Sequence, residues 1–352
     1  MKVSFTTCVG IVLLTLIGCS SGDKSSTPTT SSVSLVPPTT QSGGGAPNPS
    51  SGPTSPVTDA DDDVVSIPGI PHASYFDLVD AKAGELALIQ NLGTSSQWTE
   101  IYFVKWDGSK FNWRGRFVSA LHTHANEFEY AFADYNGDGF YDLYCLKTKN
   151  TNTNSLEVHI LDGRSGYSRF LLHTGTPIPL SSGHIAIEVG DTNRDYVQDI
   201  IVMRDDPARQ PRVEVEHLSG ATTFQTQQYF RRTILSTNVG DNYQLLHSGD
   251  INYDWVTDLF AIKKNNTASG NVEAHVLSGA HNYEAWILNK RLPKAMTADD
   301  TQDYVLIDFD GDRVQDLVVL NKSAGGLTID VISGASGLAS FIIKDVAFQP
   351  SL

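Results

Sequence analysis

The chain has 352 residues, of which 40 are acidic and 25 basic, so its formal net charge at pH 7 is −15. A charge of this sign offers no basic field to a phosphate backbone, which excludes nucleic acid as the expected partner. Apolar residues make up 40% of the chain, and 29 glycines against 3 methionines favour a turn-rich β protein over a helical bundle. Three cysteines are too few for a disulfide framework.

The first residues are typical of an export signal. Lys2 precedes an apolar run over residues 9–17, which is shorter than the ~20 residues that span a bilayer and suits the h-region of a signal peptide. The run ends in Leu16-Ile17-Gly18-Cys19, which resembles a bacterial lipobox. This resemblance implies removal of residues 1–18 and acylation of Cys19, and an ordinary secretory signal is the alternative.

Location follows from the same segment. Ser20 after the acylated cysteine resembles the outer-membrane default of such lipoproteins. We therefore expect a cell-envelope protein, an outer-membrane lipoprotein that faces the periplasm or the surface and contacts the membrane through its lipid alone.

Residues 19–71 have the composition of a tether. From Ser20 to Thr58, 30 of the 39 residues are Ser, Thr, Pro or Gly. Such a segment buries too little apolar surface to offset its conformational entropy, so we expect a disordered spacer.

The remainder, residues 72–350, contains a repeat of about 58 residues. Similar segments read DYNGDGFYDL from Asp134, DTNRDYVQDI from Asp191, DINYDWVTDL from Asp250 and DFDGDRVQDL from Asp308, at spacings of 57, 59 and 58 residues. A second motif keeps the same period, as in VEVEHLSGATTF from Val213 and VEAHVLSGAHNY from Val272. With a degenerate first copy that begins near residue 72, the chain holds five repeats.

Each repeat contains four short runs with the alternation of strands. In the third repeat these are residues 184–189, 199–203, 213–218 and 224–235. Four antiparallel strands repeated radially predict an all-β, five-bladed β-propeller, and a stacked solenoid is the alternative. Cys145 lies in one of these strands, so we expect a buried, inert thiol.

The Asp-x-Asn-x-Asp-Gly-x-x-Asp-Leu segments and their spacing resemble the FG-GAP/VCBS repeats of integrin α-chain propellers and of many bacterial surface proteins. Integrin heads have seven blades, and this chain has sequence for five. The alternatives are a closed five-bladed ring, which we favour, and an open arc completed by another copy. The oligomeric state stays open.

The acidic segments predict calcium sites. Oxygen ligands at alternate positions of a tight loop suit calcium, and a carbonyl at position 7 would complete the set. Up to four structural calcium ions are expected, and metal-free Asx turns are the alternative. The expected ligands are Asp134, Asn136, Asp138, Phe140 and Asp142; Asp191, Asn193, Asp195, Val197 and Asp199; Asp250, Asn252, Asp254, Val256 and Asp258; and Asp308, Asp310, Asp312, Val314 and Asp316. The valines at position 7 are expected to turn their side chains into the core.

The ligand face is expected opposite these loops, where basic and amide side chains recur in residues 147–150, 204–212 and 263–266. No His-Glu-x-x-His, Gly-x-Ser-x-Gly or phosphate-loop motif is present. The resemblance therefore implies a calcium-binding adhesion or binding module, without enzymatic activity, for a protein or glycan partner. The alternatives are a structural or assembly factor of the envelope and a polysaccharide lyase or hydrolase with carboxylates paired in space.

Overall fold

A computed structural model describes residues 76–81, 85–124, 127–180, 184–205, 212–236, 243–249, 251–252, 254–297, 301–323 and 326–348. The expected signal peptide, Cys19 and the tether lie outside these residues. Within the described residues, no helix has the length and apolarity needed to cross a membrane.

Twenty strands form five four-stranded antiparallel sheets, and each sheet is built from consecutive strands. Blade 1 holds β1 (Phe76–Ala81), β2 (Glu85–Gln90), β3 (Trp98–Trp106) and β4 (Phe111–His122). Blade 2 holds β5 (Phe128–Ala133), β6 (Asp142–Lys147), β7 (Ser155–Leu161) and β8 (Phe170–Pro179). Blade 3 holds β9 (His184–Gly190), β10 (Asp199–Asp205), β11 (Arg212–Leu218) and β12 (Gln227–Ser236). Blade 4 holds β13 (Tyr243–Gly249), β14 (Asp258–Lys263), β15 (Asn271–Leu277) and β16 (Trp286–Ala295), and blade 5 holds β17 (Gln302–Ile307), β18 (Asp316–Ser323), β19 (Gly326–Ile332) and β20 (Phe341–Phe348).

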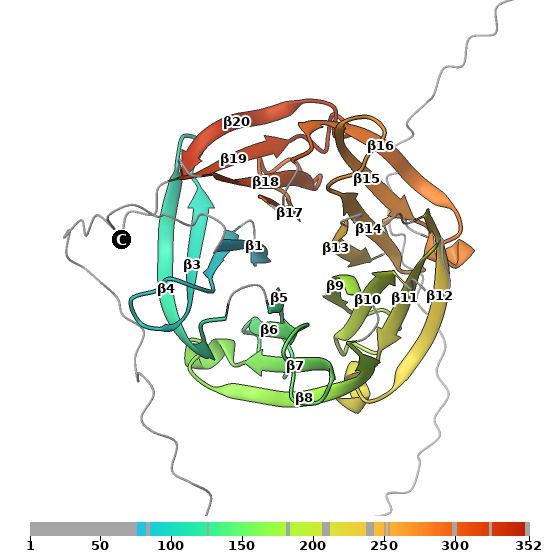
Figure 1. Cartoon of the computed structure of the whole chain (residues 1–352). Coiled ribbons are helices and arrows are strands. Elements are labelled where there is room, and N and C mark those ends of the chain that lie inside the picture. The colour runs from blue at the N-terminus through green and yellow to red at the C-terminus, as the bar shows by residue number, and fades with distance from the viewer. Residues whose placement is uncertain are drawn as a thin grey trace, which may run out of the picture. The chain divides into compact units, whose positions relative to one another are not determined.

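The five sheets stand around a central axis as the blades of a propeller (Figure 1). The first strand of each blade is innermost and the fourth is outermost. The inner strands neighbour one another in the order β1, β5, β9, β13, β17 and back to β1. The predicted five-bladed propeller is confirmed.

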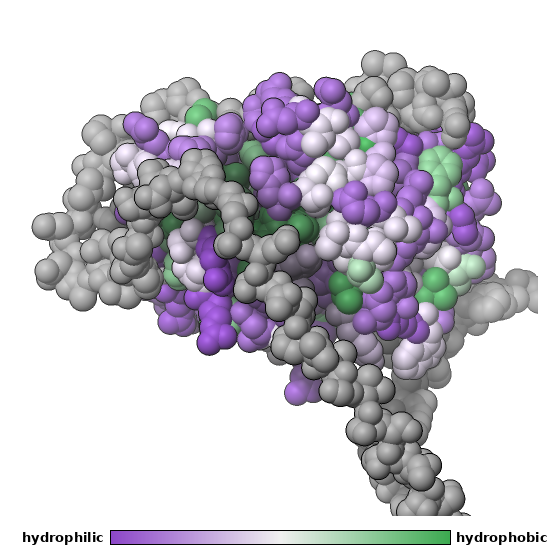
Figure 2. Space-filling view, turned by 90° about the horizontal axis from the view of Figure 1, so that it is seen from below, coloured by the Kyte–Doolittle hydropathy of each residue, from purple (hydrophilic) through white to green (hydrophobic). Residues whose placement is uncertain are grey.

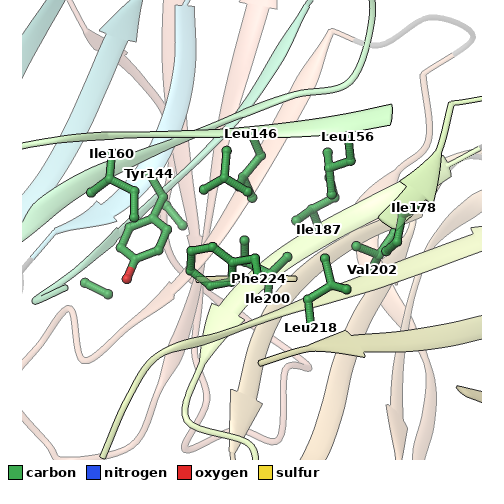
Figure 3. Packing of buried hydrophobic residues seen from close by; sticks show 13 residues of the cluster. Tyr144, Leu146, Leu156, Ile160, Ile178, Ile187, Ile200, Val202, Leu218 and Phe224 are labelled. Carbon is green, nitrogen blue, oxygen red and sulfur yellow. The ribbon is translucent and has the colours of Figure 1, made fainter. Parts of the chain in front are cut away.

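The blades hold together through apolar faces. Five buried clusters fill the five spaces between adjacent blades, and each draws its residues from both neighbours. Between blades 2 and 3, for example, Tyr144, Leu146 and Ile160 meet Ile200 and Phe224 (Figure 3). Each fully buried side chain of this kind contributes about 1.5–3 kcal/mol. On the face that Figure 2 shows, the coloured residues are mostly hydrophilic or intermediate, with small scattered apolar patches.

The ring is closed within one chain. Leu86, Leu88 and Val104 of blade 1 pack against Val318 and Leu320 of blade 5 in a cluster like the other four. Among the described residues no strand is exchanged between first and last blades, because every sheet contains consecutive strands only. Side-chain packing therefore closes the ring.

The outermost strand pair is irregular in every blade. The pairings β3–β4, β7–β8, β11–β12, β15–β16 and β19–β20 all contain register shifts. Such bulges increase the local twist and bend the outer strand, and here they set which side chains meet across each outer pair.

Candidate functional site

Carboxylates lie at the same place on the inner strands of three consecutive blades. Asp303, Asp77 and Glu129 are each the second residue of their strands, β17, β1 and β5. These three strands are neighbours in the ring. Glu129 is exposed although its strand is innermost, so solvent reaches this end of the propeller axis.

A buried lysine joins two of these carboxylates. Lys322, near the end of β18, has its ammonium 2.7 Å from Asp303 Oδ2 and 3.7 Å from Asp77 Oδ1. Its side chain is 5% exposed, against 28% for Asp77 and 12% for Asp303. The two carboxylate oxygens that contact this ammonium can lie no farther apart than the sum of their distances from its nitrogen.

Neighbouring groups fix the position of this pair. Asn91 donates its amide N–H to Asp77 Oδ2 at 2.7 Å, and the backbone N–H of Leu78 donates to Asp303 Oδ2 at 3.4 Å. Burial raises the pKa of Tyr130, with Cys145 and then Asp77 adding to the shift. Since Tyr130 follows Glu129 on β5, the field of Asp77 reaches the neighbouring blade.

The acidic loops lie at the opposite end of the blades, between the first and second strands. In the loop of blade 2, Asp134 Oδ1 accepts hydrogen bonds from the backbone N–H groups of Gly137 and Asp138, at 2.8 and 3.1 Å. Its Oδ2 accepts one from Gly139 at 2.9 Å. The equivalent Asp191 accepts from three backbone N–H groups in the same way. The first aspartate thus organises its own loop, as Asx turns do.

The last aspartate of each loop joins the two repeat motifs. Asp316 accepts from the backbone N–H of Phe309 at 3.0 Å and from that of Gly334, in the turn between the third and fourth strands, at 2.7 Å. The same two bonds recur in blades 2, 3 and 4 at Asp142, Asp199 and Asp258. These four aspartates are fully buried, and burial raises the pKa of Asp142, Asp258 and Asp316.

Glycine is required in the turn between the third and fourth strands, because the backbone of the acidic loop lies directly against it. A Cβ on Gly220 would lie 2.0 Å from the carbonyl oxygen of Gln198, and the corresponding glycines of blades 2, 4 and 5 meet the same obstacle. The last aspartate of each loop and the turn glycine therefore recur together because they are in contact.

One expectation for these loops concerns the side chains at position 7. The valines at position 7 were expected in the core, which is wrong for Val256 and Val314, 39% and 42% exposed, whereas Val197 is partly buried. The methyl group of each valine lies over the turn glycine instead. Position 6 is left-handed in all four loops, with φ of 85° at Gly139, 66° at Tyr196, 69° at Trp255 and 71° at Arg313.

The calcium sites stay a prediction. Among the described residues, the loop of blade 5 brings oxygens of Asp308, Asp310 and Asp316 within 4.8 Å of one another, close enough for one cation. Asp250 lies outside the described residues. The predicted burial of Cys145 is confirmed: the cysteine is free and fully buried, and this burial raises the pKa of its thiol.

Two of the basic side chains on the face opposite the acidic loops pair with carboxylates. Lys147 lies 3.7 Å from Glu127, and Arg204 pairs with Glu216. Residues 206–211 lie outside the described part of the chain.

No family model and no curated protein matches the chain. Several solved structures are similar to the chain in fold. An endo-arabinase from Bacteroides thetaiotaomicron is 12% identical with a TM-score of 0.47, over 80% of this chain and 99% of that one. A GH43_1 enzyme from Xanthomonas citri complexed with xylose is 10% identical with a TM-score of 0.48, over 82% and 96%. A GH62 α-L-arabinofuranosidase domain from Coprinopsis cinerea is 8% identical with a TM-score of 0.39, over 76% and 88%.

These findings correct the assignment to FG-GAP/VCBS, integrin-like propellers, because the similar structures are glycoside hydrolases of families 43 and 62 and no family model supports the repeat. The non-enzymatic adhesion or binding module that followed from that resemblance is corrected with it. At these identities and TM-scores the likeness concerns the fold alone, so any activity has to be argued from the residues of this chain.

Four residues of this site were not among those predicted from the sequence, namely Asp77, Glu129, Asp303 and Lys322. A signal was present: aligning the repeats on their first strands, rather than on their acidic loops, places the three acids at one position.

Proposed function

We propose that this protein is a polysaccharide-cleaving hydrolase whose active site lies at the inner-strand carboxylates Asp77, Asp303 and Glu129. One observation carries the proposal: three neighbouring inner strands carry a carboxylate at the same position near one end of the propeller axis, and two of these carboxylates share an ammonium. Glycosidases use two carboxyl groups about 5–9.5 Å apart, one on each side of the scissile bond.

Each group has a role in this proposal. Asp77 is the more exposed of the two lysine-bound carboxylates. It serves as the base that activates water, and the hydrogen bond from Asn91 orients it. Glu129 on the adjacent strand protonates the leaving oxygen. Lys322 and Asp303 hold Asp77 in position, because both the ammonium and the adjoining backbone of β1 are bound to Asp303.

The test is release of reducing ends from a panel of polysaccharides that includes arabinan and xylan, with the purified full chain. The substitutions Asp77→Asn and Glu129→Gln are each expected to lower the rate by about 10²-fold or more, as the loss of a general acid or base does. Glu284→Gln is the matched control, since Glu284 is an exposed carboxylate that pairs only loosely with Arg212 at 3.7 Å. Folded protein that cleaves nothing, or an Asp77→Asn variant with full activity, would refute the proposal.

A further inference from the structure

Blade 2 carries a cluster of metal-ligating side chains on its two outer strands, away from the propeller axis. Glu157, His159 and His173 each offer a ligand atom, and these three atoms lie within 4.8 Å of one another. Glu157 and His159 are two residues apart on β7, so they share a face of the sheet. His173 on β8 is the direct cross-strand partner of His159.

The imidazole of His159 is buried, and one of its nitrogens has no hydrogen-bond partner among the described residues. The residue is 7% exposed, and the nitrogen without a partner is Nε2. That nitrogen lies 3.6 Å from Glu157 Oε2, which is beyond hydrogen-bond length. Two ligands held about 2.1 Å from a tetrahedral ion lie about 3.4 Å apart, so the separation suits a bridging ion.

The carboxylate is held in place by its own blade. Glu157 Oε1 accepts from both the backbone N–H and the hydroxyl of Thr153, each at 3.0 Å. This leaves Oε2 toward the histidine, and such second contacts orient metal ligands and tune their affinity. The two imidazoles lie with their centroids 4.0 Å apart, and Phe128 and Phe170 pack around His159.

The local charges permit a cation. A neutral imidazole, the form that prevails near pH 7, offers its lone pair to a metal, and the Glu157 carboxylate adds a negative charge. The nearby ammonium of Lys147 is balanced by Glu127 at 3.7 Å.

We propose that Glu157, His159 and His173 form a binding site for a divalent transition metal, with two imidazole nitrogens and one carboxylate oxygen as protein ligands. This donor set suits zinc, with water in the fourth position. The ion would tie β7 to β8 at the bulged outer pair of blade 2. The proposal is independent of the hydrolase site, which lies on other strands.

Blade 4 contains a natural comparison. Glu273 and His275 repeat the same pair, with His275 Nε2 3.7 Å from Glu273 Oε2 and Ser269 holding Oε1 at 2.8 Å. The cross-strand partner of His275 is Asn289 rather than histidine. Both His173 and Asn289 are exposed, so exchanging these residue types tests the third ligand with little risk to the fold.

The experiment uses chelator-stripped full chain, titrated with zinc against a chromophoric chelator in a buffer with excess calcium, so that the acidic loops do not compete. We expect one zinc per chain. His173→Asn should weaken binding more than about tenfold, and Asn289→His should add a second zinc. Cobalt titration provides a second readout, since a four-coordinate site gives visible d–d absorption. A native chain that does not compete for zinc, a His173→Asn variant that binds as the native chain does, or an Asn289→His variant with unchanged stoichiometry would overturn the proposal.

Discussion

A fully buried histidine makes the stability of blade 3 sensitive to acid. His217 is 0% exposed, and among the described residues neither ring nitrogen has a hydrogen-bond partner. Its ring lies 3.9 Å from that of Tyr229. The alternation of this strand places His217 on its apolar face, which favours a core histidine with satisfied ring nitrogens; the core position holds, but the described residues leave both nitrogens without a partner.

The magnitude follows from the pKa. Burial, with a smaller contribution from Arg231, lowers the pKa of His217 from 6.5 to about 3. As the pH falls below 6.5, His217 becomes protonated in the unfolded chain but stays neutral in the folded chain. The free energy of unfolding therefore decreases between pH 6.5 and about pH 3. The loss is about 1.4 kcal/mol per pH unit, or about 3 kcal/mol between pH 6.5 and 4.

The perturbation is His217→Leu. At pH 7, removing two unsatisfied nitrogens gains about 1–3 kcal/mol, and losing the ring contact with Tyr229 costs about 0.5–1.5 kcal/mol, so the variant should be as stable as the native protein or slightly more so. Lowering the pH from 7 to 4 should raise the free energy of unfolding of the variant, relative to that of the native chain, by about 3 kcal/mol.

The assay is urea unfolding followed by tryptophan fluorescence at pH 7 and pH 4. Other titrating groups, including the buried carboxylates, contribute equally to both chains and cancel in the comparison. His281→Leu is the control, because His281 is exposed. Parallel pH dependence in the native chain and the His217→Leu variant would refute the reasoning.

Three further predictions concern the ring and its loops. Lys322→Met should lower the free energy of unfolding by about 3 kcal/mol, because it leaves two partly buried carboxylates without their ammonium; a urea midpoint unchanged from the native value would contradict this. Gly220→Ala should be far more destabilising in thermal melts than Gly137→Ala, which meets no atom within 4 Å but has a φ of 73° and should cost about 1 kcal/mol; equal effects would dismiss the close-approach explanation. If the acidic loops bind calcium, excess EDTA should lower the melting temperature and added calcium should restore it, whereas an identical melting curve in EDTA would remove calcium from the description of these loops.

The repeat made the blades predictable, but the sites depend on geometry that a repeat does not carry. Alternation and the spacing of the Asp-Leu and Ser-Gly motifs define the strands, because those motifs meet within one blade. Asp77 and Asp303 are more than 200 residues apart and become neighbours only when the ring closes. The pairing of His159 with His173 depends on bulges between β7 and β8, which no periodicity in the sequence reveals. The exposed valines at position 7 were misjudged because they cover a turn glycine at the surface rather than fill the core.

The blades are self-contained sheets, and this has a consequence for how the chain can be rearranged. Opening the propeller at any of its five seams separates side chains but breaks no strand pairing in the described sheets. A circular permutant, with its original ends joined and new ends placed between two other blades, would keep every hairpin intact. Only the permuted seam would lose its covalent link, while the Lys322 bridge between blades 5 and 1 would come to lie inside a continuous chain.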